Sequence, residues 1–417
     1  MLIHWIWFSM LPKLSIKQKN LLLERFSDPE EIYRISDFGN IAGVSPEAAS
    51  ILENKDLTAP RQVVHECAQK HISILTRADA SYPDRLRNIY DAPLVLYCKG
   101  LLPDMEVRPC IGVVGTRKAS AYGMNNARRM SMQIAACGGI VISGGATGID
   151  TMALEGALAG GGRVVAVLGN GVDVVYPRSN RKLFEQIEKN GCLLSEYLPG
   201  TEPKPWQFPE RNRIISGLSD GVFVVEAPAR SGALITAGYA LEQGRDVFVV
   251  PGNIDQPSFV GSNRLLRDGA TLVSSGWDIL SEYRALYPDK IHRDNGPSSQ
   301  TAYPDEVEKA LSDTEKPLPK VAQNPALPGK NKALKKKLEK KSIDNEPSEA
   351  YSDVNTTLPK LSADEQLIAD ALSSGERLVD DVIAETGLTA GKMLALLTML
   401  ELKGVIKRLP GKRIARK

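Results

Sequence analysis

The chain has 417 residues, and its 52 Lys and Arg residues nearly balance 50 Asp and Glu residues, for a net charge of +2. This length predicts about two to four domains, and the charge neither favours nor excludes nucleic acid as a partner. The five cysteines form no CxxC pair and the four histidines form no cluster, which argues against a disulfide or metal framework. No apolar run approaches the ~20 residues of a spanning helix, and the start lacks the features of a signal peptide. We therefore expect a cytoplasmic protein without a membrane partner.

Residues 1–72 have the pattern of a small helical domain. Residues 14–26 carry apolar side chains three and four positions apart, and Asp28 and Ser45 each precede a proline, as residues that cap helices do. A glycine-containing turn at residues 38–44 is typical of a helix-hairpin-helix or SAM-like module. Because few basic residues flank this turn, a packing role is at least as well supported as contact with DNA phosphates.

Strand-like and helical patterns alternate over residues 73–287. The expected strands are residues 94–98, 111–115, 139–143, 163–168, 192–196, 221–226, 246–250 and 270–273. Several are nearly continuous Val, Ile and Leu, which is typical of strands that helices cover on both faces. The pattern predicts a Rossmann-like, doubly wound α/β domain with a mostly parallel sheet.

Two successive strands of this domain run into turns of small residues. The turns contain Gly115, Thr116 and Arg117 after the first strand, and Ser143, Gly144 and Gly145 after the second. Backbone N–H groups of such turns, with the dipole of a following helix, bind anions. Turns after parallel strands lie at one edge of the sheet, where α/β folds bind ligands. Neither turn is a GxGxxG motif and no acidic residue ends the second strand, so we expect phosphate binding without a nicotinamide or other cofactor.

A basic and aromatic segment, residues 200–213, lies between a strand and a helix. Its prolines predict a stiff loop that presents side chains to a ligand. The candidate DNA contacts in this loop are Lys204, Phe208, Arg211, Asn212 and Arg213. Arginine forks suit phosphates, and an exposed ring suits a base. Trp206 is better interpreted as an anchor against the sheet, whereas anchoring and stacking are equally supported for Phe208.

The C-terminal part has two regions of different composition. Residues 288–358 are rich in proline, nearly lack aromatic residues and contain a lysine-dense tract, which predicts a linker without a packed core. Residues 359–417 show three helical patterns and a basic hairpin, which predict a winged helix. Lys392 is the only basic residue in the first turns of the third helix. Binding to protein is therefore as well supported for this domain as reading of DNA.

The motifs together resemble those of the DNA-processing protein A family (DprA, also called Smf), over about residues 80–283. The resemblance is carried by residues 111–117, 143–150, 176–177, 208–219, 231–237, 244–245, 250–252 and 261–263. Residues 397–411 resemble the winged-helix domain that many members carry. The resemblance implies a protein, not an enzyme, that binds incoming single-stranded DNA in bacterial natural transformation. It also implies that the protein protects this DNA, loads the RecA recombinase and works as a homodimer through the Rossmann-like domain.

The resemblance also implies roles for individual residues. Gly115, Thr116 and Arg117 match the family motif whose arginine grips the DNA backbone, and Phe208 matches the aromatic residue that stacks among bases. A family lysine precedes that aromatic residue. Lys204 is the nearest candidate, but Pro205 occupies the expected position, so Arg211 or Arg213 is a candidate for the same role.

An enzyme is the rival interpretation. Nucleotide hydrolases of the lysine-decarboxylase-like (LOG) type share a glycine-rich phosphate cradle, and their catalytic turn places a glutamate three residues after a threonine. Here Tyr239 stands three residues after Thr236, and Glu242 lies further along. Cleavage of a glycosidic bond needs a placed acid or nucleophile, so the missing carboxylate argues against this chemistry. A purely structural adaptor would not explain the two phosphate-type turns.

Overall fold

The computed structural model describes residues 2–38, 41, 44–293 and, with gaps, 363–416. Contacts between Cα atoms divide the chain into two units, Met1–Lys320 and Val321–Lys417. The expected linker, residues 288–358, lies almost entirely outside the described residues, as does most of the glycine turn at residues 38–44. No helix among the described residues is long and apolar enough to cross a membrane.

The N-terminal residues form helices, as predicted. They are α1 (Leu2–Met10), α2 (Ile16–Phe26), α3 (Pro29–Arg34), α4 (Pro46–Leu52) and α5 (Thr58–Gln69). The expected caps are present, because the Asp28 side chain accepts a hydrogen bond from the Glu30 amide and the Ser45 side chain accepts one from the Ala48 amide. These bonds satisfy amides that the helix itself leaves without a partner.

Among the described residues, nine strands form one mixed sheet in the order β1-β2-β6-β5-β4-β3-β7-β8-β9. They are β1 (Ile72–Thr76), β2 (Val95–Gly100), β3 (Cys110–Val114), β4 (Ile140–Ser143), β5 (Val164–Val167), β6 (Gly191–Ser195), β7 (Gly221–Val224), β8 (Asp246–Val249) and β9 (Thr271–Leu272). In this order, each strand from β6 through β5, β4, β3, β7 and β8 to β9 pairs in parallel with the next. Strand β2 pairs antiparallel with both β1 and β6. Each strand that the sequence predicts is present, and β1 is an additional edge strand.

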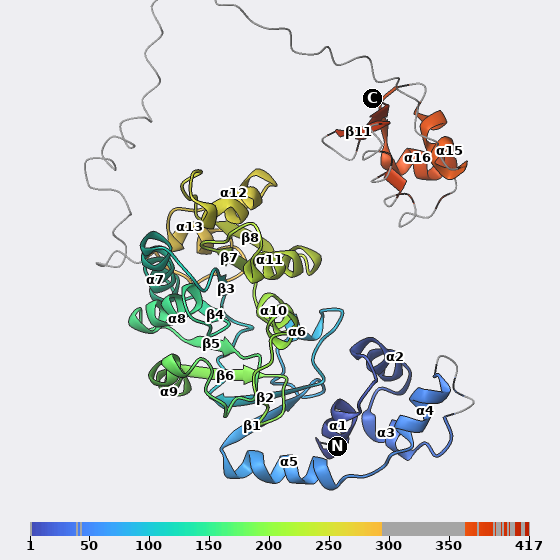
Figure 1. Ribbon diagram of the computed structural model, residues 1–417, viewed down its shortest axis with the longest axis vertical. Coiled ribbons are helices and arrows are strands. Elements are labelled where there is room, and N and C mark those ends of the chain that lie inside the picture. The colour runs from blue at the N-terminus through green and yellow to red at the C-terminus, as the bar shows by residue number, and fades with distance from the viewer. Residues whose placement is uncertain are drawn as a thin grey trace, which may run out of the picture. The chain divides into compact units, whose positions relative to one another are not determined.

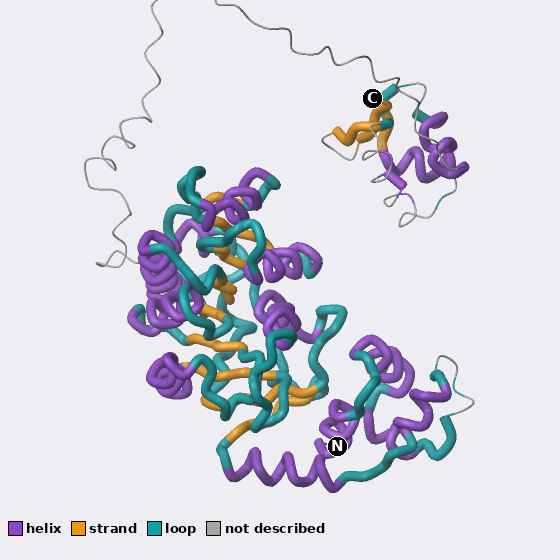
Figure 2. Tube along the Cα trace, in the orientation of Figure 1, coloured by secondary structure: helices purple, strands orange, loops and turns teal. Residues whose placement is uncertain are grey.

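Helices cover both faces of the sheet (Figures 1 and 2). They are α6 (Asp84–Arg87), α7 (Ala121–Ala136), α8 (Ile149–Ala159), α9 (Arg181–Asn190), α10 (Gln207–Gly217), α11 (Gly232–Glu242), α12 (Val260–Arg267) and α13 (Gly276–Ser281), with short 3-10 turns η1 (Arg178–Asn180) and η2 (Pro257–Phe259). Successive strand residues point to opposite faces. Ile111 and Val113 of β3 therefore join the core under α7, α8 and α9, whereas Val114 joins the core under α10 and α11. The Rossmann-like, mostly parallel α/β fold is confirmed. All five cysteines of the chain are buried free thiols, Cys67 in α5 and the other four in the Rossmann-like domain.

The second unit contains the elements of a winged helix. The described elements are α15 (Ala363–Ala371), β10 (Arg377–Leu378), α16 (Val379–Thr386), β11 (Ile406–Leu409) and β12 (Arg413–Arg416). The antiparallel pair β11 and β12 is the predicted hairpin, and β10 joins β12 to complete a three-stranded sheet. Buried Ile368, Val382 and Ile414 share one small core. Lys392 lies outside the described residues.

Candidate nucleic-acid interface

A pocket of about 360 Å³ opens at the carboxyl ends of β3, β4 and β7. Gly115, Thr116 and Arg117 line it from the turn after β3, and Ala146 lines it from the turn after β4. Because β3 and β4 pair directly in parallel, the two small-residue turns lie side by side, as the sequence predicts. The turn after β7, which begins the helix α11, closes the pocket on a third side with Arg230 and Ser231.

Close backbone approach explains the glycines of these turns. A Cβ at Gly115 would meet the Ile149 side chain, and a Cβ at Gly148 would lie 2.5 Å from the Thr116 carbonyl oxygen. Gly148 also has a φ of +83°, a conformation that favours glycine. The Ile149 amide donates to the Thr116 carbonyl oxygen over 3.3 Å. The two turns are therefore packed against each other and form one rigid edge.

Arg117 and Phe208 meet at this pocket. The exposed Arg117 places its Cζ 5.1 Å from the centroid of the half-buried Phe208 ring. The ring of Tyr176 lies on Phe208 as well, with centroids 5.5 Å apart and a tilt of 38°. A cation that can bind a phosphate is thus held beside aromatic faces that can stack on a base.

The segment that carries Phe208 is helical, which corrects the loop expected for residues 200–213. Helix α10 begins at Gln207, so only the residues before it form a loop. Trp206 is 54% exposed and contacts Tyr197 edge-on, so the prediction that it anchors the loop against the sheet is wrong. Lys204 is exposed, and Pro205, rather than Lys204, lines the pocket.

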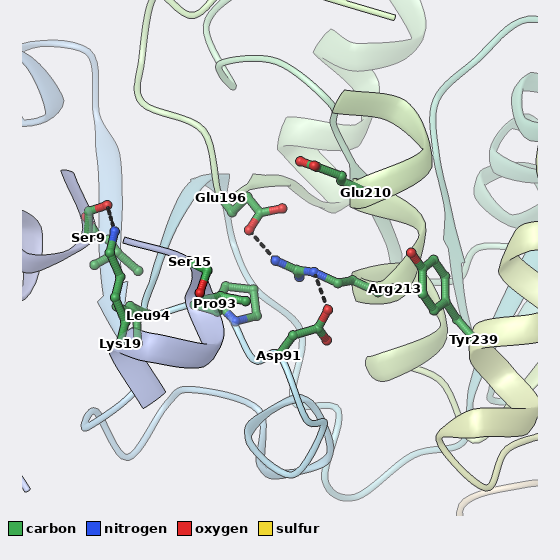
Figure 3. A pocket seen from close by; sticks show the side chains of 12 residues that line it. Ser9, Ser15, Lys19, Asp91, Pro93, Leu94, Glu196, Glu210, Arg213 and Tyr239 are labelled. Atoms are coloured by element: carbon green, nitrogen blue, oxygen red, sulfur yellow. Dashed lines mark hydrogen bonds and ion pairs between the residues drawn. The ribbon is translucent and has the colours of Figure 1, made fainter. Parts of the chain in front are cut away.

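Helical geometry separates the two arginines of α10. Residues three and four apart share a helix face, whereas a residue five positions on is turned by about 140°. Arg211 and Asn212 therefore accompany Phe208 at the pocket, and Arg213 does not. Figure 3 shows the Arg213 side chain between those of Asp91 and Glu196, with which it forms ion pairs.

Arg213 belongs to a buried ion-pair cluster. Its Nε lies 3.2 Å from an Asp91 oxygen, and its Nη2 lies 2.6 Å from an Oε of Glu196. Burial raises the pKa of Glu196, and the charge of Arg213 opposes that shift. These residues line a separate cavity of about 550 Å³ that also borders Lys19 of α2. The structure does not bring Arg213 to the glycine turns.

Arg211 lies beneath the pocket and holds its wall. The side chain is 3% exposed. Its Nη1 donates a hydrogen bond of 2.7 Å to the Gly144 carbonyl oxygen and another hydrogen bond to the Val167 carbonyl oxygen. Burial lowers the pKa of Arg211 to about 10, against the favourable charge of Asp150. Because Arg211 donates to these backbone carbonyls, we interpret it as a residue that holds the ends of β4 and β5 in position.

Asp150 at the start of α8 is the acidic group of this wall. Burial raises its pKa to about 6, although Arg211 and Arg117 favour the charged form. The carboxylate accepts a hydrogen bond from the Ala146 amide over 3.3 Å. A negative charge on Asp150 would disfavour an anion in this pocket, so the protonation state of Asp150 matters for anion binding here.

Of the remaining predicted residues, Asn212 lines the pocket, and Ser143, Gly144 and Gly145 lie behind its lining. Ser143 is buried, and its Oγ donates a hydrogen bond of 2.7 Å to the Val113 carbonyl oxygen, which links the end of β4 to β3. Gly144 and Gly145 lie outside the lining, and their carbonyl oxygens accept hydrogen bonds from Arg211 and Asn180. Asn212 lines the pocket, and its Nδ2 donates 3.2 Å to the Gly232 carbonyl oxygen.

The site residues predicted from the sequence do not include Tyr176, Asp150, Arg230 or Ser231. The rule that placed two turns at one sheet edge applies equally to the turn after β7, which pairs with β3 in parallel. Applying that rule would have identified Arg230 and Ser231. Tyr176 follows β5 by several residues, and its position beside Phe208 depends on how its loop folds back.

The fold and the pocket define a Rossmann-like α/β protein with a glycine-lined site at the carboxyl edge of the sheet and no dinucleotide motif. Residues 73–284 match the family described as DNA recombination-mediator protein A, and residues 354–412 match the DprA winged helix domain. The chain belongs to the DNA recombination-mediator protein A (DprA/Smf) family.

Individual relatives agree with this assignment. The chain is 36% identical over 370 residues to Protein Smf of Synechocystis sp., covering 88% of this chain and 86% of the relative. It is 45% identical over 205 residues to DNA processing protein DprA of Streptococcus pneumoniae, covering 49% of this chain and 72% of that protein. The X-ray structure of DprA from Streptococcus pneumoniae matches with a TM-score of 0.57 and 34% identity, over 68% of this chain and 98% of that one.

Proposed function

We propose that this protein binds single-stranded DNA, with little preference for sequence, at the pocket formed by the ends of β3, β4 and β7. The observation that carries the proposal is the contact between Arg117 and Phe208, whose guanidinium carbon and ring centroid are 5.1 Å apart. Phosphates would bind Arg117 and the amides of the turns, and a base would stack on the exposed part of Phe208. Every nucleotide has a phosphate and an aromatic face, so such contacts do not depend on sequence.

We further propose that the protein protects incoming DNA during natural transformation and loads the RecA recombinase onto it in the cytoplasm, acting as a homodimer through the Rossmann-like unit. Membership of the recombination-mediator family supports this process. Relatives named DNA processing protein DprA support it as well. The pocket lies at the sheet edge, so a bound strand remains open to a partner along its length.

We do not propose a catalytic role. Tyr239, which stands where LOG-type hydrolases carry a glutamate, borders the other cavity with Arg213. Glu242 is exposed at the end of α11. Asp150 is the carboxylate that lines the pocket, but it is buried and receives a backbone hydrogen bond from Ala146. Only 7% of Asp150 is exposed, so a substrate in the pocket has little access to its oxygens.

A titration of the full chain against single-stranded DNA, duplex DNA and free nucleotides, repeated across salt concentrations, tests the proposal. Single strands should bind more tightly than duplex or nucleotides, with an affinity that falls as salt rises because phosphate contacts release counterions. Chromatography of the nucleotide samples tests the rival. Release of a free base from a nucleotide, or equal affinity for all ligands, would contradict a single-strand binder.

A further inference from the structure

A second aromatic ring, that of Tyr176, lies beside Phe208 and remains 40% exposed. The two ring centroids are 5.5 Å apart with an interplanar tilt of 38°. Phe208 comes from α10 and Tyr176 from the connection between β5 and α9, so two separate elements bring the rings together. The exposed part of the Tyr176 ring therefore offers a second aromatic face next to Phe208 on which a base could stack.

The backbone around Tyr176 is tied to the glycine turn after β4. Asn180, four residues later, donates from Nδ2 to the Gly145 carbonyl oxygen over 3.0 Å and to Thr151 Oγ1 over 2.8 Å. Thr151 in turn donates to the Ala146 carbonyl oxygen over 2.7 Å. The connection is thus anchored on the same turn that forms the pocket. A ring on an anchored connection loses little conformational entropy when a ligand stacks on it.

Gly169, just after β5, leaves room for the Phe208 ring beside Tyr176. A Cβ at Gly169 would lie 3.0 Å from Cδ1 of Phe208, tighter than side chains normally pack, so glycine lets the Phe208 ring lie against the end of β5. From this position the ring contacts Arg117 and Tyr176. Phe208 thus links the Arg117 guanidinium to the Tyr176 ring.

We propose that Tyr176 is a second base-stacking residue, so that neighbouring bases of one single strand stack on Phe208 and on Tyr176 while Arg117 binds the backbone. This inference rests on the proposed single-strand function. It assigns the DNA a path across the protein surface, from the turn after β3, over the start of α10, to the connection between β5 and α9. The competing explanation is that Tyr176 only supports the Phe208 ring.

The test compares variants of the full chain in their affinity for a labelled oligothymidine. Tyr176→Leu keeps an apolar side chain against Phe208 but removes the aromatic face, whereas Tyr176→Phe keeps that face. Tyr176→Leu should weaken binding by roughly five- to a hundredfold, with an unchanged salt dependence, and Tyr176→Phe should bind as the wild type does. Tyr90→Leu is the matched control, because Tyr90 is 73% exposed and borders a different cavity.

A second arm separates stacking from support. Tyr176→Leu is combined with Phe208→Ala, and a direct role for Tyr176 predicts weaker binding by the double variant than by Phe208→Ala alone. Photocrosslinking to an oligonucleotide that contains 5-iodouracil should label both Tyr176 and Phe208. Wild-type affinity in Tyr176→Leu, no further loss in the double variant, or labelling at Phe208 without Tyr176 would each overturn the inference. These results leave the proposed function standing, which fails instead if the wild type does not bind single strands.

Discussion

The guanidinium carbon of Arg117 lies 5.1 Å from the centroid of the Phe208 ring, at the mouth of the pocket formed by the ends of β3, β4 and β7. One residue comes from the turn after β3 and the other from the first turn of α10. In the proposed complex with single-stranded DNA, the ionic contact of Arg117 with a phosphate should weaken as salt rises, whereas stacking of a base on Phe208 should not. Variants of the two residues should therefore differ in their effects.

Arg117→Glu should weaken binding of single-stranded DNA at least about tenfold at low salt, because it places an anion at the proposed phosphate site. The side chain is exposed, so the fold should be unaffected. Fluorescence anisotropy and a thermal melt measure the two effects. Lys189→Glu, the same charge reversal at an exposed position of α9, is the control. A folded Arg117→Glu protein that binds as tightly as wild type would show that Arg117 does not grip phosphate.

Phe208→Ala should weaken binding by roughly ten- to a hundredfold while leaving the salt slope near that of the wild type, because stacking on a base involves no counterion. Affinity measured at several salt concentrations, beside thermal melting, tests this expectation. If Phe208 were only an anchor, the variant would melt early and yet bind normally while folded.

Arg213→Ala should lower stability by about 3 kcal/mol or more, because it leaves the partly buried carboxylates of Asp91 and Glu196 without their cation. The salt slope of single-strand binding should not change, since the side chain lies away from the pocket. Urea denaturation and salt-dependent titration are the measurements. A slope reduced by about one, with unchanged stability, would instead place Arg213 on a phosphate.

Asp150 should make stability depend on pH. Its folded pKa of about 6 exceeds its ordinary value of 3.8, so the folded state holds the proton more tightly than the unfolded state. This stabilisation of the folded state is fully present below about pH 4 and is lost as pH rises through 6, a change of about 3 kcal/mol at most. Denaturation from pH 4 to 7.5 should show this fall in wild type and a smaller one in Asp150→Asn. Glu185→Gln, at an exposed position of α9, is the control, and identical profiles for wild type and Asp150→Asn would contradict the shift.

Removal of residues 359–417 should leave single-strand affinity largely unchanged, because the pocket lies wholly in the first unit. Affinity for duplex DNA or for a protein partner is the property that the winged helix would alter. Anisotropy with single and double strands measures both. A truncated protein that remains folded but no longer binds single strands would move the main site into the winged helix.

The strands, the helix caps and the adjacency of the two small-residue turns could all be predicted from the sequence alone. Runs of Val, Ile and Leu are stable only where helices cover both faces of a strand, and Asp28 and Ser45 bond the amides that follow them, so these features are local. The turns after β3 and β4 follow from topology, because consecutive parallel strands with helical crossovers end at one edge.

The positions of the side chains in the basic and aromatic segment, by contrast, depend on tertiary contacts that the sequence does not reveal. Because α10 begins at Gln207, Phe208 and Arg211 share one helix face and Arg213 lies on another, where it meets Asp91. A loop has no helical periodicity to separate side chains by face. Interpreted as part of a loop, Arg211 and Arg213 were therefore equivalent candidates. The contact of Tyr176 with Phe208 was equally out of reach, because it joins elements that are distant in the chain and meet only when the sheet is complete.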